Sequence, residues 1–149
     1  MSQIRLATLD DLRAVESIVA AAYSPYIARM GQKPGPMLDD YAEHIRQGRV
    51  HVIDMDGAPA ALLVLIPEDD AMLLDNVAVS PAGRGTGLGR QLIQFAERAA
   101  SAAGYKTIRL YTHVTMTENI ELYRRIGYVE THRQVQKGLS RVFMSKRLG

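Results

Sequence analysis

The stretch "VAVSPAGRGTGLGRQLIQFAERAA", residues 77–100, decides how this chain folds. It begins with a β-branched run typical of a strand, passes through four glycines in seven positions, and ends with apolar side chains at helical spacing. Glycine lets the backbone come close to a ligand, and the free N–H groups at a helix start attract phosphate. Since a plain turn needs only one glycine, this strand, loop and helix predict a phosphate-binding unit.

Two familiar phosphate-binding patterns do not fit this loop. A P-loop requires Lys and then Ser or Thr after its last glycine, whereas Arg90 and Gln91 follow here. The dinucleotide pattern G-x-G-x-x-G fails because its third glycine would fall on Arg90 or Leu92. The sequence therefore favours a third kind of phosphate cradle.

Length and composition limit the classes of protein to consider. A chain of 149 residues with 47% hydrophobic and 23% charged residues suits one ordinary globular domain, expected to span residues 1–149. The absence of cysteine excludes disulfides, thiolate metal sites and a cysteine nucleophile. A net charge of +2 gives no basic coat of the kind that binds nucleic acid.

We expect no targeting segment and no membrane span in this chain. Its opening, "MSQIRLATLDDLRAVE", has no basic segment followed by an apolar one, and no apolar run approaches the length of a membrane span. We therefore expect a cytoplasmic protein with no membrane and no nucleic-acid partner. The cationic segment 132–147 keeps a nucleic-acid protein open as an alternative, but no aromatic stacking platform accompanies it.

Short strands and helices alternate along the chain. Strands are expected near residues 3–8, 49–55, 58–66, 71–80, 105–113, 128–136 and 140–148, and helices near residues 9–23, 38–48, 88–103 and 117–127. Three consecutive strands before the first strong crossover exclude a doubly wound sheet, and the two late crossovers exclude a sandwich. A mixed sheet flanked by helices remains.

These motifs resemble one known family. "RGTGLG", residues 84–89, following "VAVSP", is similar to the Gln/Arg-x-x-Gly-x-Gly/Ala signature of the GNAT superfamily of acyl-CoA-dependent N-acyltransferases, and "NIELYRRIGYVE", residues 119–130, resembles its second motif. The resemblance implies an α/β fold with a mixed, mostly antiparallel sheet of about seven strands, splayed into a V between the fourth and fifth strands and flanked by about four helices. Acetyl-CoA would lie in that cleft as co-substrate.

The resemblance also implies which residues hold the coenzyme. Backbone N–H groups of residues 85–89 would cradle the CoA pyrophosphate, and the strand before them would pair with the pantetheine arm, much as a peptide extends a sheet edge. The expected coenzyme-binding residues are Val77, Ala78, Val79, Arg84, Gly85, Thr86, Gly87, Leu88, Gly89, Arg90, Asn119 and Tyr123.

The helix near residues 117–127 is expected to carry the catalytic acid. Thr115 and Glu118 predict a capping box that starts this helix near Met116, and Asn119 and Tyr123, four residues apart, share one face. The resemblance puts that face on the CoA arm, with Asn119 as a hydrogen-bond partner and Tyr123 as the general acid that protonates the leaving thiolate. The alternative for Tyr123 is core packing with its hydroxyl at the rim.

No residue is clearly marked as the base that deprotonates the amine. Asp75, on the strand before the glycine loop, is the best candidate, directly or through water; an exposed strand carboxylate is the alternative. His113, at the end of the fifth strand, could be a base, a substrate contact or a solvated side chain. His44, His51 and His132 lack metal-ligand spacing, so we expect no metal.

The acceptor side of the cleft is harder to define. The resemblance makes residues 21–41 one wall of it, with an aromatic and acidic lining of Tyr23, Tyr26, Met30, Met37, Asp39 and Asp40. Either aspartate could instead cap a helix, and capping is favoured for Asp39. The expected acceptor contacts are Tyr26, Met30, Asp40 and His113.

Together these features predict an N-acetyltransferase that moves an acetyl group from acetyl-CoA to a primary amine by direct attack in a ternary complex. The acceptor would be a small molecule or a peptide. The alternative is a module that binds or senses acyl-CoA without turnover. Members of the family are often dimers, so a homodimer joined near the C-terminal hairpin is one arrangement to consider.

Overall fold

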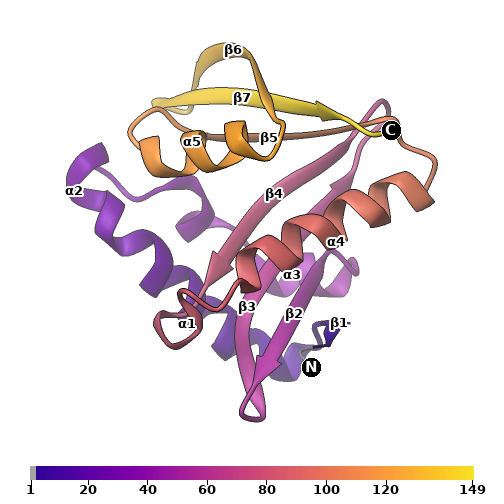
Figure 1. Ribbon diagram of the computed structural model, residues 1–149. Coiled ribbons are helices and arrows are strands. Elements are labelled where there is room, and N and C mark those ends of the chain that lie inside the picture. Colours follow the sequence, from indigo (N-terminus) through magenta and orange to yellow (C-terminus); the bar gives the residue numbers. More distant parts are fainter. Residues whose placement is uncertain (1–2) are drawn as a thin grey trace.

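A computed structural model describes residues 3–149 (Figure 1). Seven strands form one sheet in the order β1-β2-β3-β4-β5-β7-β6, and every neighbouring pair is antiparallel except β4 and β5. The strands are β1 (Ile4–Leu6), β2 (Val50–Met55), β3 (Ala58–Pro67), β4 (Met72–Val79), β5 (Thr107–His113), β6 (Val129–Gln136) and β7 (Leu139–Arg147). The mixed seven-stranded sheet expected from the sequence is confirmed.

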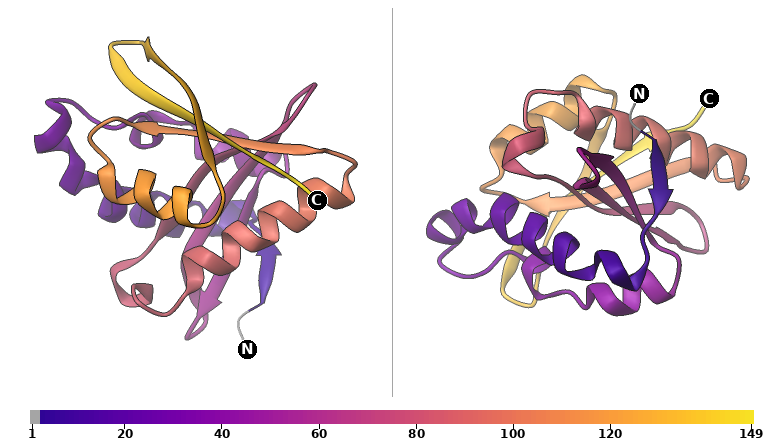
Figure 2. Two further views of the ribbon diagram at one scale, coloured as in Figure 1. Left: turned by 45° about the horizontal axis from the view of Figure 1, so that its top comes forward. Right: turned by 90° about the horizontal axis from the view of Figure 1, so that it is seen from below.

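Helices cover both faces of the sheet. They are α1 (Leu12–Tyr23), α2 (Ile27–Met30), α3 (Tyr41–Arg46), α4 (Leu88–Ala102) and α5 (Thr117–Arg125). Helices α4 and α5 pack on one face, and α1 and α3 on the other (Figure 2). Three-residue and four-residue turns of 3₁₀ helix precede α1, α2, α3 and the glycine loop. Within residues 3–149, no helix has both the length and the apolar character needed to cross a membrane.

The two layers of helices bury two apolar clusters. Strands β2 and β3 are buried on both faces along much of their length, as continuous apolar runs predict. Helix α4 lays Leu88, Leu92 and Ala96 against one face, while α1 lays Val15 and Val19 against the other. The packing of α4 on the sheet fixes both ends of the glycine loop, which joins β4 to α4.

The sheet splits between β4 and β5. Their parallel ladder contains only Met72 and Leu73 opposite Ile108 and Arg109. Beyond it β5 stays with β7 along its whole length, so the C-terminal ends of β4 and β5 separate into a V (Figure 1). This confirms the splay between the fourth and fifth strands.

A β-bulge in β4 lies where the strands separate. Strand β3 pairs Val64 with Asn76 and Leu65 with Leu74, which leaves Asp75 as the extra residue. Bulges bend a strand and redirect a side chain, and they are frequent beside active sites. The bulge turns the Asp75 carboxylate toward the cleft.

The expected capping box at α5 is wrong. Helix α5 begins at Thr117 with Met116 before it, and no side chain caps it. The Glu118 carboxylate instead accepts two hydrogen bonds from across the cleft. Arg29 Nη1 donates to its Oε1 at 2.7 Å, and the Tyr26 hydroxyl donates to its Oε2 at 3.1 Å. An ion pair with a segment distant in sequence therefore replaces the local bond.

Candidate active site

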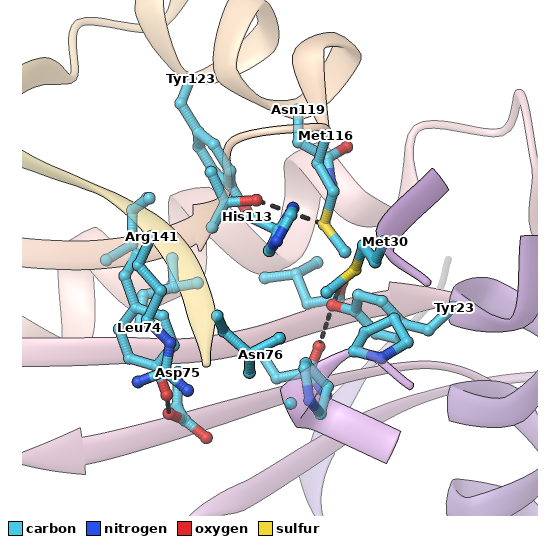
Figure 3. Close-up of a pocket in the computed structure, with 18 residues that line it drawn as sticks. Tyr23, Met30, Leu74, Asp75, Asn76, His113, Met116, Asn119, Tyr123 and Arg141 are labelled. Atoms are coloured by element: carbon cyan, nitrogen blue, oxygen red, sulfur yellow. Dashed lines mark hydrogen bonds between the residues drawn. The ribbon is translucent and has the colours of Figure 1, made fainter. Parts of the chain in front are cut away.

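Two adjoining hollows occupy the V. The first, here called the glycine-loop hollow, lies between the end of β4, the start of α4, α5 and the α1–α2 segment. The second, here called the β5–β7 pocket, lies between β4, β5, β7 and the loop 34–36 (Figure 3). Four residues line both: Tyr23, Val77, Asn119 and Tyr123. A molecule in one hollow therefore adjoins a molecule in the other.

The glycine loop leaves free backbone donors beside the first hollow, which is lined by its flanking residues Arg84, Gly89 and Arg90. Gly85 and Gly87 have φ angles of 76° and 82°, a left-handed backbone that favours glycine. Within residues 3–149, the N–H groups of Gly85 and Gly87 have no acceptor, nor do those of residues 88–90 in the first turn of α4. Free donors of this kind, with the positive end of a helix dipole, attract anions.

The space beside the loop is open, which tests whether a phosphate could fit. A Cβ built on Gly85 or Gly87 would meet no atom within 4 Å, so packing within the chain does not require these glycines. Gly83 differs, because its Cβ would lie 2.9 Å from Leu88. Arg84 and Arg90 line the hollow, and neither forms an ion pair with any residue of the described chain. The cradle fits a phosphate-bearing group.

The edge of β4 that faces the cleft has no partner strand. After Leu73, its remaining residues have no ladder with β5. Val77, Ala78 and Val79 line the glycine-loop hollow along this edge. An extended chain lying there could add hydrogen bonds to the sheet.

Helix α5 points Asn119 and Tyr123 into the junction of the two hollows (Figure 3). Among the residues that the structure describes, none hydrogen-bonds the Tyr123 hydroxyl, and the only hydrogen bond of the Asn119 side-chain amide goes to the Met116 sulfur at 3.8 Å. Burial raises the pKa of Tyr123 to about 12. The phenol therefore keeps its proton at neutral pH and has it free to donate.

Asp75 is half-buried in the β5–β7 pocket. Its Oδ1 accepts a hydrogen bond from the Tyr111 hydroxyl at 3.0 Å. Ligand atoms of Asp39, His44 and Asp75 lie within 4.8 Å of one another, a grouping that their spacing in the sequence did not predict. Burial, and after it the neighbouring Asp39 carboxylate, raises the pKa of Asp75. A carboxylate with a raised pKa is a stronger base than an ordinary one.

His113 ends β5 beside the same pocket. Its Nδ1 accepts a hydrogen bond from the backbone N–H of Thr115 at 3.1 Å, which places the proton of the neutral ring on Nε2. Burial, and secondly the charge of Arg141, lowers the pKa of His113. The ring is therefore neutral at pH 7 and offers the pocket a hydrogen-bond donor, which suits a substrate contact better than a base.

The hollows include most of the residues that the sequence singled out. The glycine-loop hollow is lined by Tyr26, Val77, Ala78, Val79, Arg84, Gly89, Arg90, Asn119 and Tyr123. The β5–β7 pocket is lined by Met30, Asp75 and His113, with Val77, Asn119 and Tyr123 again. Gly85, Thr86, Gly87 and Leu88 line neither: the first three form the loop itself, and the Leu88 side chain is buried in the core.

The capping assignment at α3 needs correction. Asp40, expected at the acceptor, is exposed, lines neither hollow, and caps α3 by accepting the Glu43 N–H at 3.1 Å. Asp39, expected as the cap, instead lies 3.5 Å from His44 Nε2 and close to Asp75. Asp40 rather than Asp39 caps the helix because the chain enters α3 one residue later.

Sequence reasoning missed several lining residues of the β5–β7 pocket, chiefly Tyr111 and Arg141. Tyr111 shares the strand parity of His113, which was a usable signal. Arg141 lies opposite His113 only because of the β5–β7 register, and nothing local in the sequence reveals that pairing.

Comparisons with known proteins agree with this geometry. A model of the Acetyltransferase (GNAT) domain matches residues 46–130, more than half of the chain, and the chain belongs to this family. The PaiA N-acetyltransferase of Thermoplasma acidophilum, crystallised with coenzyme A, is 15% identical with a TM-score of 0.80, and the match covers 99% of each chain.

A second solved structure is the ribosomal-protein-S18-alanine N-acetyltransferase of Escherichia coli. It is 19% identical with a TM-score of 0.73, and the match covers 100% of this chain and 95% of that one. A GCN5-related N-acetyltransferase from Rhodopseudomonas palustris is 21% identical with a TM-score of 0.79, over 99% and 96% of the two chains. At these identities the likeness concerns the fold.

Proposed function

We propose that residues 1–149 act as one N-acetyltransferase domain, which moves an acetyl group from acetyl-CoA to a primary amine by direct attack in a ternary complex. The observation that carries the proposal is the placement of the glycine loop. It leaves unpaired N–H groups beside the glycine-loop hollow, which adjoins the β5–β7 pocket at Asn119 and Tyr123. Family membership and the solved structure of a relative with coenzyme A support the same reading.

The residues of the glycine-loop hollow would hold the coenzyme. The free N–H groups of Gly85, Gly87 and residues 88–90 would bind its pyrophosphate, and Arg84 and Arg90 would add positive charge. The unpaired edge at Val77–Val79 would hydrogen-bond the pantetheine arm, and Asn119 would offer its amide. Acetyl-CoA supplies an activated thioester; the chain supplies its orientation.

Tyr123 would act as the general acid. The deprotonated amine nitrogen attacks the thioester carbonyl carbon, a C–N bond forms, and the C–S bond breaks. After the attack the nitrogen loses a second proton, which would replace the one that Tyr123 gives up. Tyr123 gives its proton to the departing thiolate, for which it must be protonated beforehand, and its raised pKa ensures that it is. Its hydroxyl has no hydrogen bond to break within the described chain.

Asp75 would take the proton that the amine must lose, directly or through water. The pKa of Asp75 is raised and so lies closer to neutral pH than that of an ordinary aspartate. Asp75 also lines the pocket from which an acceptor would approach. Much of the remaining acceleration would come from holding amine and thioester together.

Thermal unfolding with and without acetyl-CoA tests the proposal first, with dephospho-CoA, NAD and ATP at equal concentrations as controls. At a hundred times Kd, binding contributes about 2.7 kcal/mol, which raises Tm by about 5–10 °C. Release of free CoA thiol with a panel of amines then tests turnover. A Tm unmoved by acetyl-CoA would contradict the proposal, and a rise without transfer to any amine would indicate a binding module.

A further inference from the structure

The β5–β7 pocket contains a guanidinium that the proposed reaction does not use. Arg141 lies on β7 between His113 on β5 and Gln134 on β6. Its Cζ lies 4.3 Å from the centre of the Tyr111 ring, and its Nη1 donates to Gln136 Oε1 at 2.7 Å. Both partners are uncharged, so the positive charge is not neutralised by them.

Arg141 differs in this respect from half of the fourteen arginines of the chain. Within residues 3–149, no carboxylate comes within 4.0 Å of its guanidinium, although the side chain is half-buried. Seven other arginines do pair with carboxylates: Arg5, Arg29, Arg46, Arg109, Arg124, Arg125 and Arg133. A guanidinium carries five N–H donors in a fork that matches a carboxylate, and residues 3–149 use only one of those of Arg141.

The chain closes over Arg141 with a short, tight loop. A Cβ on Gly35 would lie 3.3 Å from Arg141 Nη2, so glycine permits this approach. Gln32 donates from Nε2 to the carbonyl of Gly138 at 3.1 Å, which holds the loop on the β6–β7 turn. Pro34 and Pro36 continue the lining. A ligand at Arg141 is thus confined on this side and must be small.

A carboxylate lies in the same pocket, separate from the guanidinium. Tyr111 contacts both groups: its hydroxyl donates to Asp75, and its ring lies beneath Arg141. Asp75 and Arg141 are more than 4.0 Å apart, so they do not form an ion pair with each other. Figure 3 shows both side chains at the wall opposite Tyr23 and Met30. The pocket therefore offers one positive and one negative group to a ligand that carries both charges.

We propose that Arg141 binds the carboxylate of the acceptor, and that the acceptor is an amino acid or a similarly small amine bearing a carboxylate. This inference rests on the proposed acetyl transfer. The amine would face Asp75 and the thioester, while the carboxylate, which takes no part in bond making, would fix the acceptor at Arg141. Apolar side chains of Met30 and Leu139 leave room for a small apolar substituent.

The test compares amino acids with their α-amides, which keep the amine and lose the charge of the carboxylate. Acetyl transfer from acetyl-CoA to each of the proteinogenic amino acids and its amide is followed by release of the CoA thiol. We expect kcat/KM for the preferred acid to exceed that of its amide by roughly 10–100-fold, the range for a hydrogen bond to a charged group. Arg141→Gln should remove that preference, mainly by raising KM for the acid.

Two variants make the result specific. Arg133→Gln makes the same substitution on the same hairpin at an exposed residue outside the pocket, and it should keep the preference. Arg141→Lys keeps the positive charge but loses the forked pair of N–H donors, so it should keep part of the preference for acids over amides. Unchanged Tm values, and an unchanged rise in Tm with acetyl-CoA, establish that the variants are folded and still bind the coenzyme.

Amides used as well as acids, or equal losses for acids and amides in Arg141→Gln, would overturn the inference. If acetyl-CoA raises Tm but no amine is acetylated, calorimetric titration of the protein–CoA complex with the same acids and amides tests whether Arg141 binds a carboxylate. Binding of acids alone, lost in Arg141→Gln, supports the anchor, and binding of neither overturns it. If acetyl-CoA itself does not bind, the proposed function fails, and the same titrations of the free protein still judge Arg141.

Discussion

The hydroxyl of Tyr111 donates a hydrogen bond to the carboxylate of Asp75, 3.0 Å away, across two strands whose backbones have already separated. The bond joins the two arms of the V by side chains alone. It also holds a half-buried carboxylate close to that of Asp39, although burial and a second negative charge both oppose ionisation. Such an arrangement costs stability, and a catalytic base is one reason to keep it.

Replacing Asp75 by Asn should lower activity and leave the fold intact or more stable. Loss of a positioned base lowers kcat by roughly 10²–10⁴. The pKa of Asp75 is raised in the folded protein, so the folded state binds more protons than the unfolded state between the two pKa values, and wild-type stability falls as pH rises through that window. The amide of the Asp75→Asn variant does not ionise, so its stability lacks this dependence.

Thermal unfolding of both proteins as a function of pH measures this effect. The Tm of the Asp75→Asn variant relative to that of the wild type should increase as pH rises. The amide oxygen of Asn can still accept the hydrogen bond from the Tyr111 hydroxyl, so this contact should remain. Asp54→Asn is a control at an aspartate outside the cleft that pairs with Arg5. Full activity in Asp75→Asn would remove this residue from the mechanism.

Replacing Tyr123 by Phe should reduce kcat by roughly 10²–10⁴ and leave the affinity for acetyl-CoA nearly unchanged, because it removes a proton donor and little surface. Wild-type activity should show no decline from ionisation of this tyrosine near neutral pH, since its pKa is raised to about 12. Steady-state kinetics and acetyl-CoA titration measure the two quantities.

Tyr105→Phe provides a matched control for this variant. In the wild type the Tyr105 hydroxyl donates to the Glu68 backbone carbonyl at 2.8 Å, away from both hollows. That variant should lose about 1 kcal/mol of stability and no activity. Equal kcat for wild type and Tyr123→Phe would show that another group or water protonates the thiolate.

Features governed by local chemistry were predictable from the sequence. The run of glycines predicted the loop in which Gly85 and Gly87 take positive φ angles, and the spacing beyond it predicted the start of α4 near Leu88. Alternating residues on β4 and apolar runs on β2 and β3 gave strands within two residues of those observed. In these segments the local preference and the final fold agree.

The features that were missed depend on partners distant in sequence. Glu118 has the spacing of a capping box, yet Arg29 and Tyr26 attract it across the cleft. The proximity of Asp39 to Asp75 depends on how the 31–40 segment returns to the sheet, and that of Arg141 to His113 depends on register. Local sequence rules contain neither piece of information, so acceptor-side residues are harder to predict than the coenzyme loop.

Replacing Asn76 by Ala should destabilise the protein through the loss of a buried hydrogen-bond network. Asn76 is 3% exposed; its Oδ1 accepts from Tyr23 and its Nδ2 donates to Tyr41 at 2.9 Å, which ties α1 and α3 to β4. Leaving buried hydroxyls short of a partner costs about 1–3 kcal/mol. We expect Tm to fall by about 2–12 °C, measured against Gln134→Ala, an exposed site on β6. A Tm within a degree of wild type would contradict the role of this network.

Replacing Gly87 by Val should abolish acetyl-CoA binding while the protein still folds. A Cβ there would meet no atom of the chain within 4 Å, so the substitution costs mainly the strain of a left-handed backbone, about 1–2 kcal/mol. The added methyl groups would instead occupy the space beside the free N–H groups, where the pyrophosphate is proposed to bind.

Gly57→Val separates these two effects. Gly57, in the β2–β3 turn, has a φ of 83° against 82° for Gly87, and it too has no atom within 4 Å of a built Cβ. The two variants should therefore unfold at similarly reduced temperatures, but only Gly57→Val should keep the rise in Tm with acetyl-CoA. A rise of equal size in Gly87→Val would mean that the loop serves as a turn and that the coenzyme binds elsewhere.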